Sequence, residues 1–465
     1  MSCQVIVSAV LAFAATSTLA ANTPVPFYGQ SASGKSTPPR GWNSFVAQSK
    51  GLDLTVSLLD EQCSFFYNNT ESDFNYVCGF DSGWSADYNG DEYGRIIPKD
   101  SVFNTMSIQD FAAKLHGNGM KLGIYMIPGA FTSDVNKTVI GTDIKIGSLF
   151  NTTEDPRDAI SNSYNARNDF DYNKDGVQQW HDSVVELFNS CDYLSGDKNN
   201  AKPANDSGAV ACMHNAIMKY APAMQLDISW RLEREEPFWD LWQHNADTIR
   251  VDRDINYGKN AVTWGPTQRT IEQYRVFINQ QVLDSTRQNK PIMIRPDMDN
   301  LLVAAPSSSS LGLGTAPSSD MLKPSYGLAR EWLHLPRIIQ WCLKILPTQE
   351  PGGPNASQLQ AWIAGPNDAG TAVVVLSNLG PDECWDNECS YNTKTTGDQL
   401  VNVTLSDLGI GGDKWFVRRV LGGGGRGGED GTDIGVADAE LASWLSEHES
   451  VLYKLQKCGS EGASC

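Results

Sequence analysis

The stretch Cys191-Asp-Tyr-Leu-Ser-Gly-Asp197 constrains the fold of this chain more than any other. It follows a segment whose apolar residues recur at the spacing of one buried helical face: Val177, Trp180, Val184, Leu187 and Phe188. A short apolar strand, Tyr193-Leu194, then runs into Gly196-Asp197. A carboxylate at that point lies at the carboxyl edge of a parallel sheet, where barrels of alternating strands and helices collect their catalytic groups. The alternative is that Asp197 only starts a turn.

A second acidic strand end follows two strand-helix units later, in Arg250-Val-Asp-Arg-Asp254. Two carboxylates on neighbouring strand ends are the minimum equipment for cleaving a glycosidic bond. We therefore treat Asp197 and Asp254 as candidate catalytic residues.

Residues 24–346 alternate between apolar strands and amphipathic helices. Polar residues repeatedly follow the strands, as in Asp81-Ser-Gly-Trp84 and Arg295-Pro-Asp297. Ser107, with Asp110 three residues later, predicts the start of one of the helices. Repeated strand-helix units with polar residues after the strands predict a (β/α)8 barrel. A doubly wound open sheet is the alternative, but no Gly-x-Gly-x-x-Gly turn follows the first strand.

The pattern changes beyond Gln349, where Pro351-Gly-Gly-Pro354 marks a boundary. Residues 350–465 contain short β-rich runs separated by turns, with little helical pattern: 359–364, 371–378, 401–406, 415–421 and 451–457. This arrangement predicts a C-terminal antiparallel β-sandwich.

The N-terminus and the charge balance predict an exported soluble protein. Residues 1–20 contain an apolar run too short to span a bilayer, followed by a small-residue cleavage site, so we interpret them as a signal peptide. Six Asn-x-Ser/Thr sequons agree with secretion: Asn68, Asn136, Asn151, Asn205, Asn355 and Asn402. A formal net charge of −19 without a basic cluster argues against nucleic acid and anionic membranes as partners.

Nine cysteines remain after the leader, so one is left over from any set of pairs. Sequence proximity suggests Cys63–Cys78, Cys191–Cys212, Cys384–Cys389 and Cys458–Cys465, although sequence does not fix connectivity. The chain has no Cys-x-x-Cys and no closely spaced His pair, and we expect neither a metal nor a cofactor.

Six motifs in this order resemble glycoside hydrolase family 27, the melibiase-type α-galactosidases, and especially their secreted fungal branch. They are Gly41-Trp-Asn-Ser-Phe45, Asp81-Ser-Gly-Trp84, Lys121-Leu-Gly-Ile-Tyr125, Asp192-Tyr-Leu-Ser-Gly-Asp197, Arg250-Val-Asp-Arg-Asp254 and Pro296-Asp-Met298. The resemblance covers residues 40–456. It implies a barrel followed by a β-sandwich, with Asp197 as the nucleophile and Asp254 as the acid/base.

The chain also departs from the family pattern. Ser195 stands where the family usually has a sugar-binding Lys, and Ser82 where it often has a second Asp. A family disulfide between positions near Asn200 and Ile228 is absent. Residues 304–332, rich in Ser, Gly and Pro, look shortened relative to the family's last helix and strand.

The remaining candidate residues fit a sugar site. Arg250 is expected to hold Asp254 or a sugar hydroxyl, and Asp81, Asp227 and Asp297 to accept hydrogen bonds from hydroxyls. The rings of Trp42, Trp84 and Trp230 are candidates for stacking on a pyranose, with packing at the top of the barrel as the alternative.

Three functions remain open at this point. The first is a retaining exo-acting α-galactosidase. The second is a related glycosidase such as a β-L-arabinopyranosidase, which the serines at 82 and 195 keep open. The third is an inactive carbohydrate-binding homologue.

Overall fold

The computed structural model describes the following residues: 29–35, 39, 41–45, 48, 53–68, 76–152, 167–197, 203–229, 233–254, 264–283, 287, 290–297, 299, 344–347, 358–381, 395–422 and 431–459. Described residues up to Asp299 belong to one compact unit, and those from Lys344 onward belong to a second. The predicted signal peptide and the shortened segment 304–332 lie outside the described residues.

The first unit is built on a sheet of seven described strands that are all parallel to their neighbours. The strands follow the chain order β1 (Gly41–Asn43), β2 (Val77–Phe80), β3 (Lys121–Met126), β6 (Tyr193–Asp197), β7 (Gln225–Ser229), β8 (Thr248–Arg250) and β9 (Arg295–Asp297). Consecutive parallel strands with helices between them confirm the predicted barrel-like α/β architecture.

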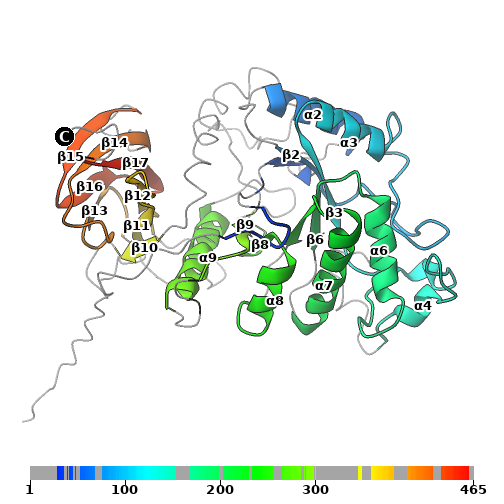
Figure 1. Ribbon diagram of the computed structural model, residues 1–465. Helices are drawn as coiled ribbons and strands as arrows, with labels where there is room; N and C mark the ends of the chain where they lie inside the picture. The colour runs from blue at the N-terminus through cyan, green and yellow to red at the C-terminus, as the bar shows by residue number, and fades with distance from the viewer. Residues whose placement is uncertain are drawn as a thin grey trace, which may run out of the picture. The chain divides into compact units, whose positions relative to one another are not determined.

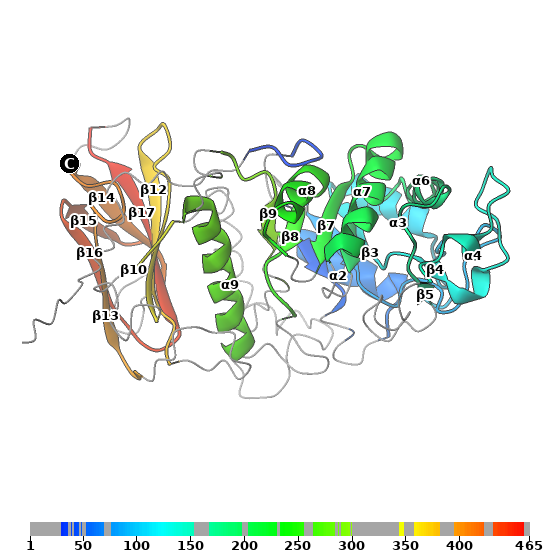
Figure 2. The same cartoon turned by 90° about the horizontal axis from the view of Figure 1, so that it is seen from below.

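Helices connect these strands and cover the outside of the sheet. They are α2 (Val56–Asn68), α3 (Ile108–Gly117), α4 (Ile146–Leu149), α6 (Val177–Leu187), α7 (Pro203–Tyr220), α8 (Phe238–Asn245) and α9 (Trp264–Leu283). Figure 1 shows α3, α6, α7 and α8 following one another around the curved sheet, and Figure 2 shows the same helices from below. A 3-10 turn, η1 (Thr132–Asp134), and a two-stranded ribbon of β4 (Ala130–Phe131) and β5 (Arg167–Asn168) lie between β3 and α6.

Local sequence explains why these helices begin and which face they bury. The Ser107 hydroxyl accepts a hydrogen bond from the Asp110 amide at 3.1 Å and so caps α3, as predicted. The apolar side of α3 is buried through Ile108, Phe111 and Leu115. Apolar residues at this spacing pack a helix against a sheet, since they share one face.

The second unit consists of two antiparallel sheets around a common apolar core. The larger has the order β10 (Lys344–Pro347), β11 (Leu359–Ala364), β12 (Thr371–Asn378), β17 (Glu449–Lys457), β14 (Trp415–Gly422) and β15 (Asp433–Ala437). The smaller pairs β13 (Gln399–Thr404) with β16 (Glu440–Leu445). Buried residues of both sheets form one cluster, among them Val374, Val401, Leu445 and Leu455. The predicted antiparallel β architecture is therefore confirmed.

Two details of this unit differ from the sequence prediction. The segment Lys344–Pro347, assigned from the sequence to the end of the barrel, pairs with β11 of the second unit. Strands β15 and β16 were not predicted from the sequence, and several of their apolar residues are exposed: Ile434, Val436 and Trp444.

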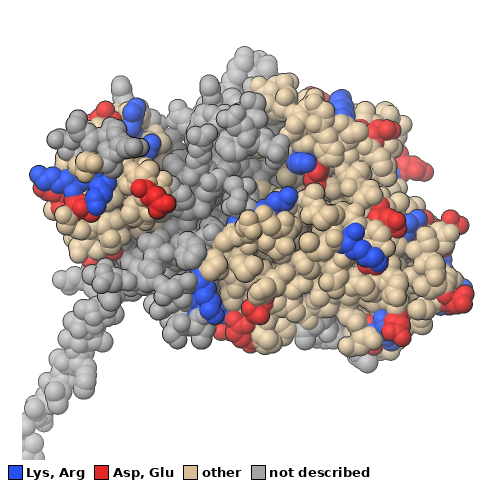
Figure 3. Space-filling view, viewed as in Figure 1, with Lys and Arg blue, Asp and Glu red and all other residues tan. Residues whose placement is uncertain are grey.

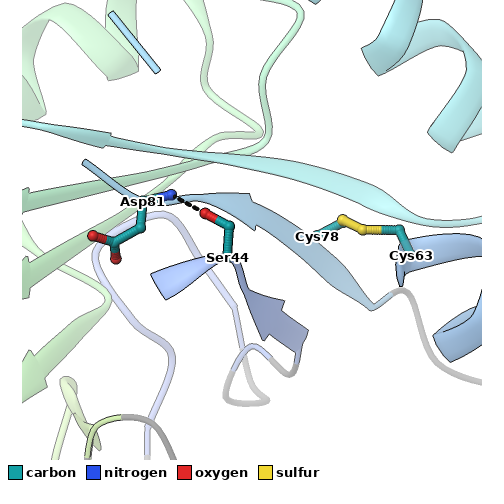
Figure 4. Close-up of a disulfide and its surroundings, with 4 residues drawn as sticks. All are labelled: Ser44, Cys63, Cys78 and Asp81. Carbon is teal, nitrogen blue, oxygen red and sulfur yellow. Dashed lines mark hydrogen bonds between the residues drawn. A yellow bond between two sulfur atoms is a disulfide. The ribbon is translucent and has the colours of Figure 1, made fainter. Parts of the chain in front are cut away.

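The cysteines of the first unit are paired only in part as predicted. Cys63 of α2 and Cys78 of β2 form a disulfide (Figure 4). The predicted pair Cys191–Cys212 is wrong, since both thiols are free. Cys191 lies beyond the end of α6, whereas Cys212 lies beside the first turns of that helix, where its carbonyl accepts a hydrogen bond from Gln178 at 3.0 Å. Burial raises the pKa of these thiols to about 12 for Cys191 and about 11 for Cys212.

The described surface carries interspersed charges of both signs. Figure 3 shows Lys and Arg side chains beside Asp and Glu on the face in view. An example is the ion pair of Lys114 with Asp60, at 2.7 Å. Within the described ranges, no helix combines the length and the apolar character that crossing a membrane requires.

Candidate active site

The candidate catalytic residues lie at the carboxyl edge of the parallel sheet, Asp197 at the end of β6 and Asp254 after β8. They do not follow neighbouring strands as predicted, because β7 lies between β6 and β8. Asp197 is the last residue of β6 and stands opposite Ser229, the last residue of β7. Arg250, the last residue of β8, stands opposite Asp297, the last residue of β9. Neighbouring strands are about 4.8 Å apart, so these strand ends form one continuous row. The side chain of Asp197 lies outside the described part of the structure.

Arg250 connects the members of this row. Its Nη1 donates to the Ser229 hydroxyl at 3.1 Å and lies 2.8 Å from the Asp254 carboxylate. Its Nη2 lies 3.3 Å from the carboxylate of Asp299. The side chain of Arg250 is 8% exposed. The guanidinium therefore fixes the position of Asp254, one of the two partners expected for Arg250, relative to the end of β7.

The surroundings of Asp254 favour its protonated form. Burial is the main cause that raises the pKa of this carboxyl, and the charge of Asp299 raises it further. The nearby Arg250 and Arg269 act in the opposite direction. The side chain keeps 37% of its surface exposed, so a substrate oxygen has access to it. A carboxyl that is held in place, is accessible and has a raised pKa has the properties of a general acid.

Two further carboxylates, those of Asp227 and Asp297, lie close to each other and to Arg250. Burial, followed by the charge of Asp227, raises the pKa of Asp297 to about 7. Asp227 is buried at 4% exposure and accepts a hydrogen bond from the Thr248 hydroxyl. The Tyr193 hydroxyl lies 2.9 Å from the same Thr248 oxygen. Asp227 was predicted to bind sugar hydroxyls, but it lies two residues before the end of β7 and is engaged inside the sheet. Its role in binding sugar hydroxyls stays a prediction.

Asp81 lies at the same edge, directly after β2. Its amide donates to the Ser44 hydroxyl at 2.8 Å (Figure 4), and its carboxylate accepts from the Ser82 amide at 2.7 Å. Burial is the main cause that raises its pKa, and the charge of Asp299 contributes in the same direction. Asp81 is therefore close enough to Asp299, which contacts Arg250, for their charges to interact.

The three candidate tryptophans have different environments. Trp84 is 1% exposed and packs edge to face against Phe188, with ring centroids 5.3 Å apart. A fully buried ring has no face left for a sugar, so the stacking prediction for Trp84 is wrong. Trp42, in β1, is partly buried and packs against the main core. Trp230 follows β7 immediately and lies outside the described residues.

Asp299 is the residue of this site that the sequence analysis missed. It follows β9 by two residues, has a positive φ of 69° and donates its amide to the Asp297 carboxylate at 2.8 Å. An Asp that accepts a hydrogen bond from the amide two residues later forms an Asx-turn. The spacing Asp297-x-Asp299 is therefore the signal that was available in the sequence.

The described residues contain no group of three or more His, Cys, Asp or Glu side chains arranged to hold a metal ion. The carboxylates of the edge are instead balanced by Arg250. Carboxylates Asp299, Asp254 and Asp297 raise the pKa of the guanidinium against the effect of burial, which keeps it charged. This arrangement can supply acid, base and hydrogen-bond acceptors.

Comparison with known proteins shows the family of the chain. No protein-family model matches the chain. It is 32% identical to alpha-galactosidase 3 of Hypocrea jecorina over 90% of this chain and 70% of that protein. It is 31% identical to putative alpha-galactosidase 8 of Emericella nidulans, over 80% of this chain and 79% of that protein. The chain belongs to glycoside hydrolase family 27, the α-galactosidase family.

Solved structures of family 27 share its fold. A β-L-arabinopyranosidase from Geobacillus stearothermophilus, solved with arabinose, aligns with a TM-score of 0.68 at 18% identity and covers 91% of this chain and 98% of its own. Alpha-galactosidase I from Mortierella vinacea aligns with a TM-score of 0.58 at 15% identity, over 91% of this chain and 98% of its own. As a member of family 27, the chain is a glycoside hydrolase of the α-galactosidase type.

Proposed function

We propose that this protein is a secreted exo-acting glycosidase that removes terminal α-D-galactosyl residues from oligosaccharides or polysaccharides with retention of configuration. The observation that carries the proposal is the Arg250–Asp254 ion pair at 2.8 Å, on the edge where β6 ends in Asp197. Membership of the α-galactosidase family supports the choice of sugar.

In this mechanism the two carboxylates have separate roles. Asp197 attacks the anomeric carbon while Asp254 gives its proton to the departing glycosidic oxygen, so that a glycosyl ester forms on Asp197. Asp254, now ionised, takes a proton from water, and the resulting hydroxide displaces the sugar from the ester. Arg250 stabilises the ionised form of Asp254 between the two steps.

Two further residues are assigned to the sugar itself. Asp81 and Asp297 follow β2 and end β9 at the same edge, and each has carboxylate oxygens that can accept hydrogen bonds from hydroxyl groups. Trp42, partly exposed in the middle of β1, is the candidate tryptophan that remains for stacking on the pyranose.

Azide rescue tests this division of labour. The Asp254→Asn variant should lose most of its activity, and azide should restore turnover because it attacks the ester without a general base. The product should be an α-galactosyl azide, whose configuration is inverted relative to the ester on Asp197. The Asp197→Asn variant is the matched control, and azide should not restore retaining turnover in it. If azide restores neither variant, the assignment of roles is wrong.

Hydrolysis of β-L-arabinopyranosides is the second candidate function. This sugar has the ring layout of galactose without the hydroxymethyl group. Ser82 and Ser195 replace two groups that family members use around the sugar, which leaves the choice of sugar open. Hydrolysis rates for p-nitrophenyl α-galactoside and p-nitrophenyl β-L-arabinopyranoside decide between the two. Binding of either sugar without turnover would instead identify an inactive homologue.

Secretion is tested by mass. Two sequon asparagines, Asn68 and Asn136, are exposed in the structure and accessible to a glycosyltransferase. The secreted protein should begin near Ala21 and lose mass when N-glycans are removed. A protein that retains Met1 and shows no mass shift on this treatment would contradict the secretion proposal.

A further inference from the structure

The position of Asp299 suggests a role that the family resemblance does not supply. Its carboxylate lies 3.3 Å from Nη2 of Arg250, while Nη1 of the same guanidinium lies 2.8 Å from Asp254. One arginine thus faces two carboxylates that follow neighbouring strands. Asp299 is 11% exposed and Asp254 is 37% exposed. The more exposed carboxyl is thus Asp254, which has to reach the substrate oxygen, whereas Asp299 does not.

The backbone at Asp299 indicates that this placement is specific. Asp299 has a φ of 69°, a conformation that costs most L-residues free energy but that Asp and Asn adopt more readily than others. The turn is closed by the hydrogen bond from its amide to the Asp297 carboxylate, at 2.8 Å. This turn directs the chain after β9 so that the Asp299 carboxylate meets Arg250.

We propose that Asp299 is a positioning residue that acts through Arg250 to hold Asp254 as the proton donor of the reaction. The inference rests on the proposed function, since it deepens the role assigned to Asp254. By occupying Nη2, Asp299 orients the guanidinium so that Nη1 points to Asp254. Its negative charge also opposes loss of the proton from Asp254.

The charged groups around Asp254 support this direction of the effect of Asp299 on the pKa of Asp254. Arg250 from β8 and Arg269 from α9 favour the ionised carboxylate, and Arg269 also donates to the Asp254 carbonyl at 2.9 Å. Asp299, after β9, is the group among these that favours the protonated form. Removing the Asp299 charge should therefore let Asp254 ionise at lower pH.

The variant Asp299→Asn separates charge from geometry. Asn tolerates the positive φ, and its amide oxygen still accepts a hydrogen bond from Arg250, so the fold and the turn are kept. A unit charge a few ångströms away in a partly buried site changes a pKa by about one unit, and we expect the alkaline limb of kcat/KM to move down by about one pH unit. The matched control is Asp60→Asn, which removes a partly exposed carboxylate paired with Lys114 in the same unit.

Leaving-group dependence distinguishes positioning from direct contact with the sugar. A p-nitrophenyl glycoside needs little protonation, whereas the alkyl glycoside of the same sugar depends on the acid. At pH values above the shifted alkaline limb, Asp299→Asn should slow hydrolysis of the alkyl glycoside more than that of the aryl glycoside. The KM should change little. An equal loss on both substrates with a raised KM would overturn the proposal and make Asp299 a sugar ligand. An alkaline limb that coincides with that of the wild type would also overturn it.

A carboxyl titration by NMR reads the same effect without turnover. The Asp254 signal, assigned by its loss in Asp254→Asn, should titrate at lower pH in Asp299→Asn than in the wild type or in Asp60→Asn. An unchanged titration refutes the inference about Asp299. A wild-type protein that hydrolyses neither test glycoside refutes the proposed function, and the titration still decides the role of Asp299.

Discussion

The two edges of the parallel sheet use the same residue type in opposite ways. At the amino edge, Asp192 precedes β6 and Asp247 precedes β8, and each accepts a hydrogen bond from a backbone amide of the preceding strand in the sheet. The donors are the Leu122 amide at 3.0 Å and the Leu226 amide at 2.8 Å. These carboxylates thus accept hydrogen bonds from backbone amides near the starts of the neighbouring strands.

At the carboxyl edge the carboxylates face one another instead. Asp227 and Asp299 both raise the pKa of Asp297, and Asp299 raises that of Asp254. Charge repulsion of this kind costs folding free energy, and it provides groups that exchange protons in the pH range of enzymes. We therefore expect the amino edge to contribute stability and the carboxyl edge to contribute chemistry.

Removing Asp197 should give the largest effect on activity. The Asp197→Asn variant keeps the shape of the side chain but has no nucleophile, so activity should fall on the order of 10⁴-fold or more for every leaving group. Thermal unfolding should stay close to that of the wild type. Retention of most activity would show that the carboxyl edge acts through another residue.

Removing Asp247 should give the largest effect on stability. This side chain is 3% exposed and accepts hydrogen bonds from the Leu226 amide, from the Ser33 amide at 3.1 Å and from the Ser31 hydroxyl. Asp247→Ala leaves buried donors without an acceptor and should cost about 3 kcal/mol in urea unfolding. Asp247→Asn, which keeps an acceptor, is the control and should cost less. Folded Asp247→Ala protein should retain its kcat; a selective loss of kcat would place catalysis at both edges.

The carboxyl edge should also make stability depend on pH. The folded pKa of Asp297 is about 7, above the value of 3.8 for an unperturbed Asp. Its stabilising contribution is therefore complete below about pH 4 and is lost as the pH rises through 7, which should amount to roughly a few kcal/mol. Asp297→Asn should reduce the dependence of the free energy of unfolding on pH between 4 and 8. An identical dependence in this variant would show that the buried pair is not the source.

Asp192 should give the smallest effect. Its other partners are Lys121 at 2.8 Å and His116 at 2.6 Å, both more than a third exposed. Exposed ion pairs contribute little, so Asp192→Asn should cost about 1 kcal/mol or less in urea unfolding. A loss as large as that of Asp247→Ala would show that burial does not separate the two amino-edge carboxylates.

The sequence could predict what depends on local spacing. Arg250 was expected to hold Asp254 or a sugar hydroxyl, and it contacts Asp254 in the structure. Ser107, with Asp110 three residues later, predicted the start of α3. The alternation of strands and helices predicted the parallel sheet, since each unit carries its own apolar pattern.

The depth at which a side chain is buried, and the direction that a turn gives the chain, could not be predicted in the same way. A strand pattern gives the face of Asp227 but not how far below the edge it lies. Trp84 follows a strand end, yet its ring is directed into the core against Phe188. Cys191 and Cys212 are close in sequence, but α6 and α7 hold them at different heights. Asp299 reaches Arg250 only because the chain adopts a positive φ there.

Covalent trapping of the glycosyl enzyme tests the central claim most directly. A 5-fluoro galactosyl fluoride reacts with the nucleophile of a retaining enzyme and leaves the sugar bound as an ester that hydrolyses slowly. We expect one label per chain, located by peptide mass analysis on Asp197, and no label in Asp197→Asn. A label on another carboxylate, or hydrolysis of the reagent without any covalent adduct, would contradict this expectation.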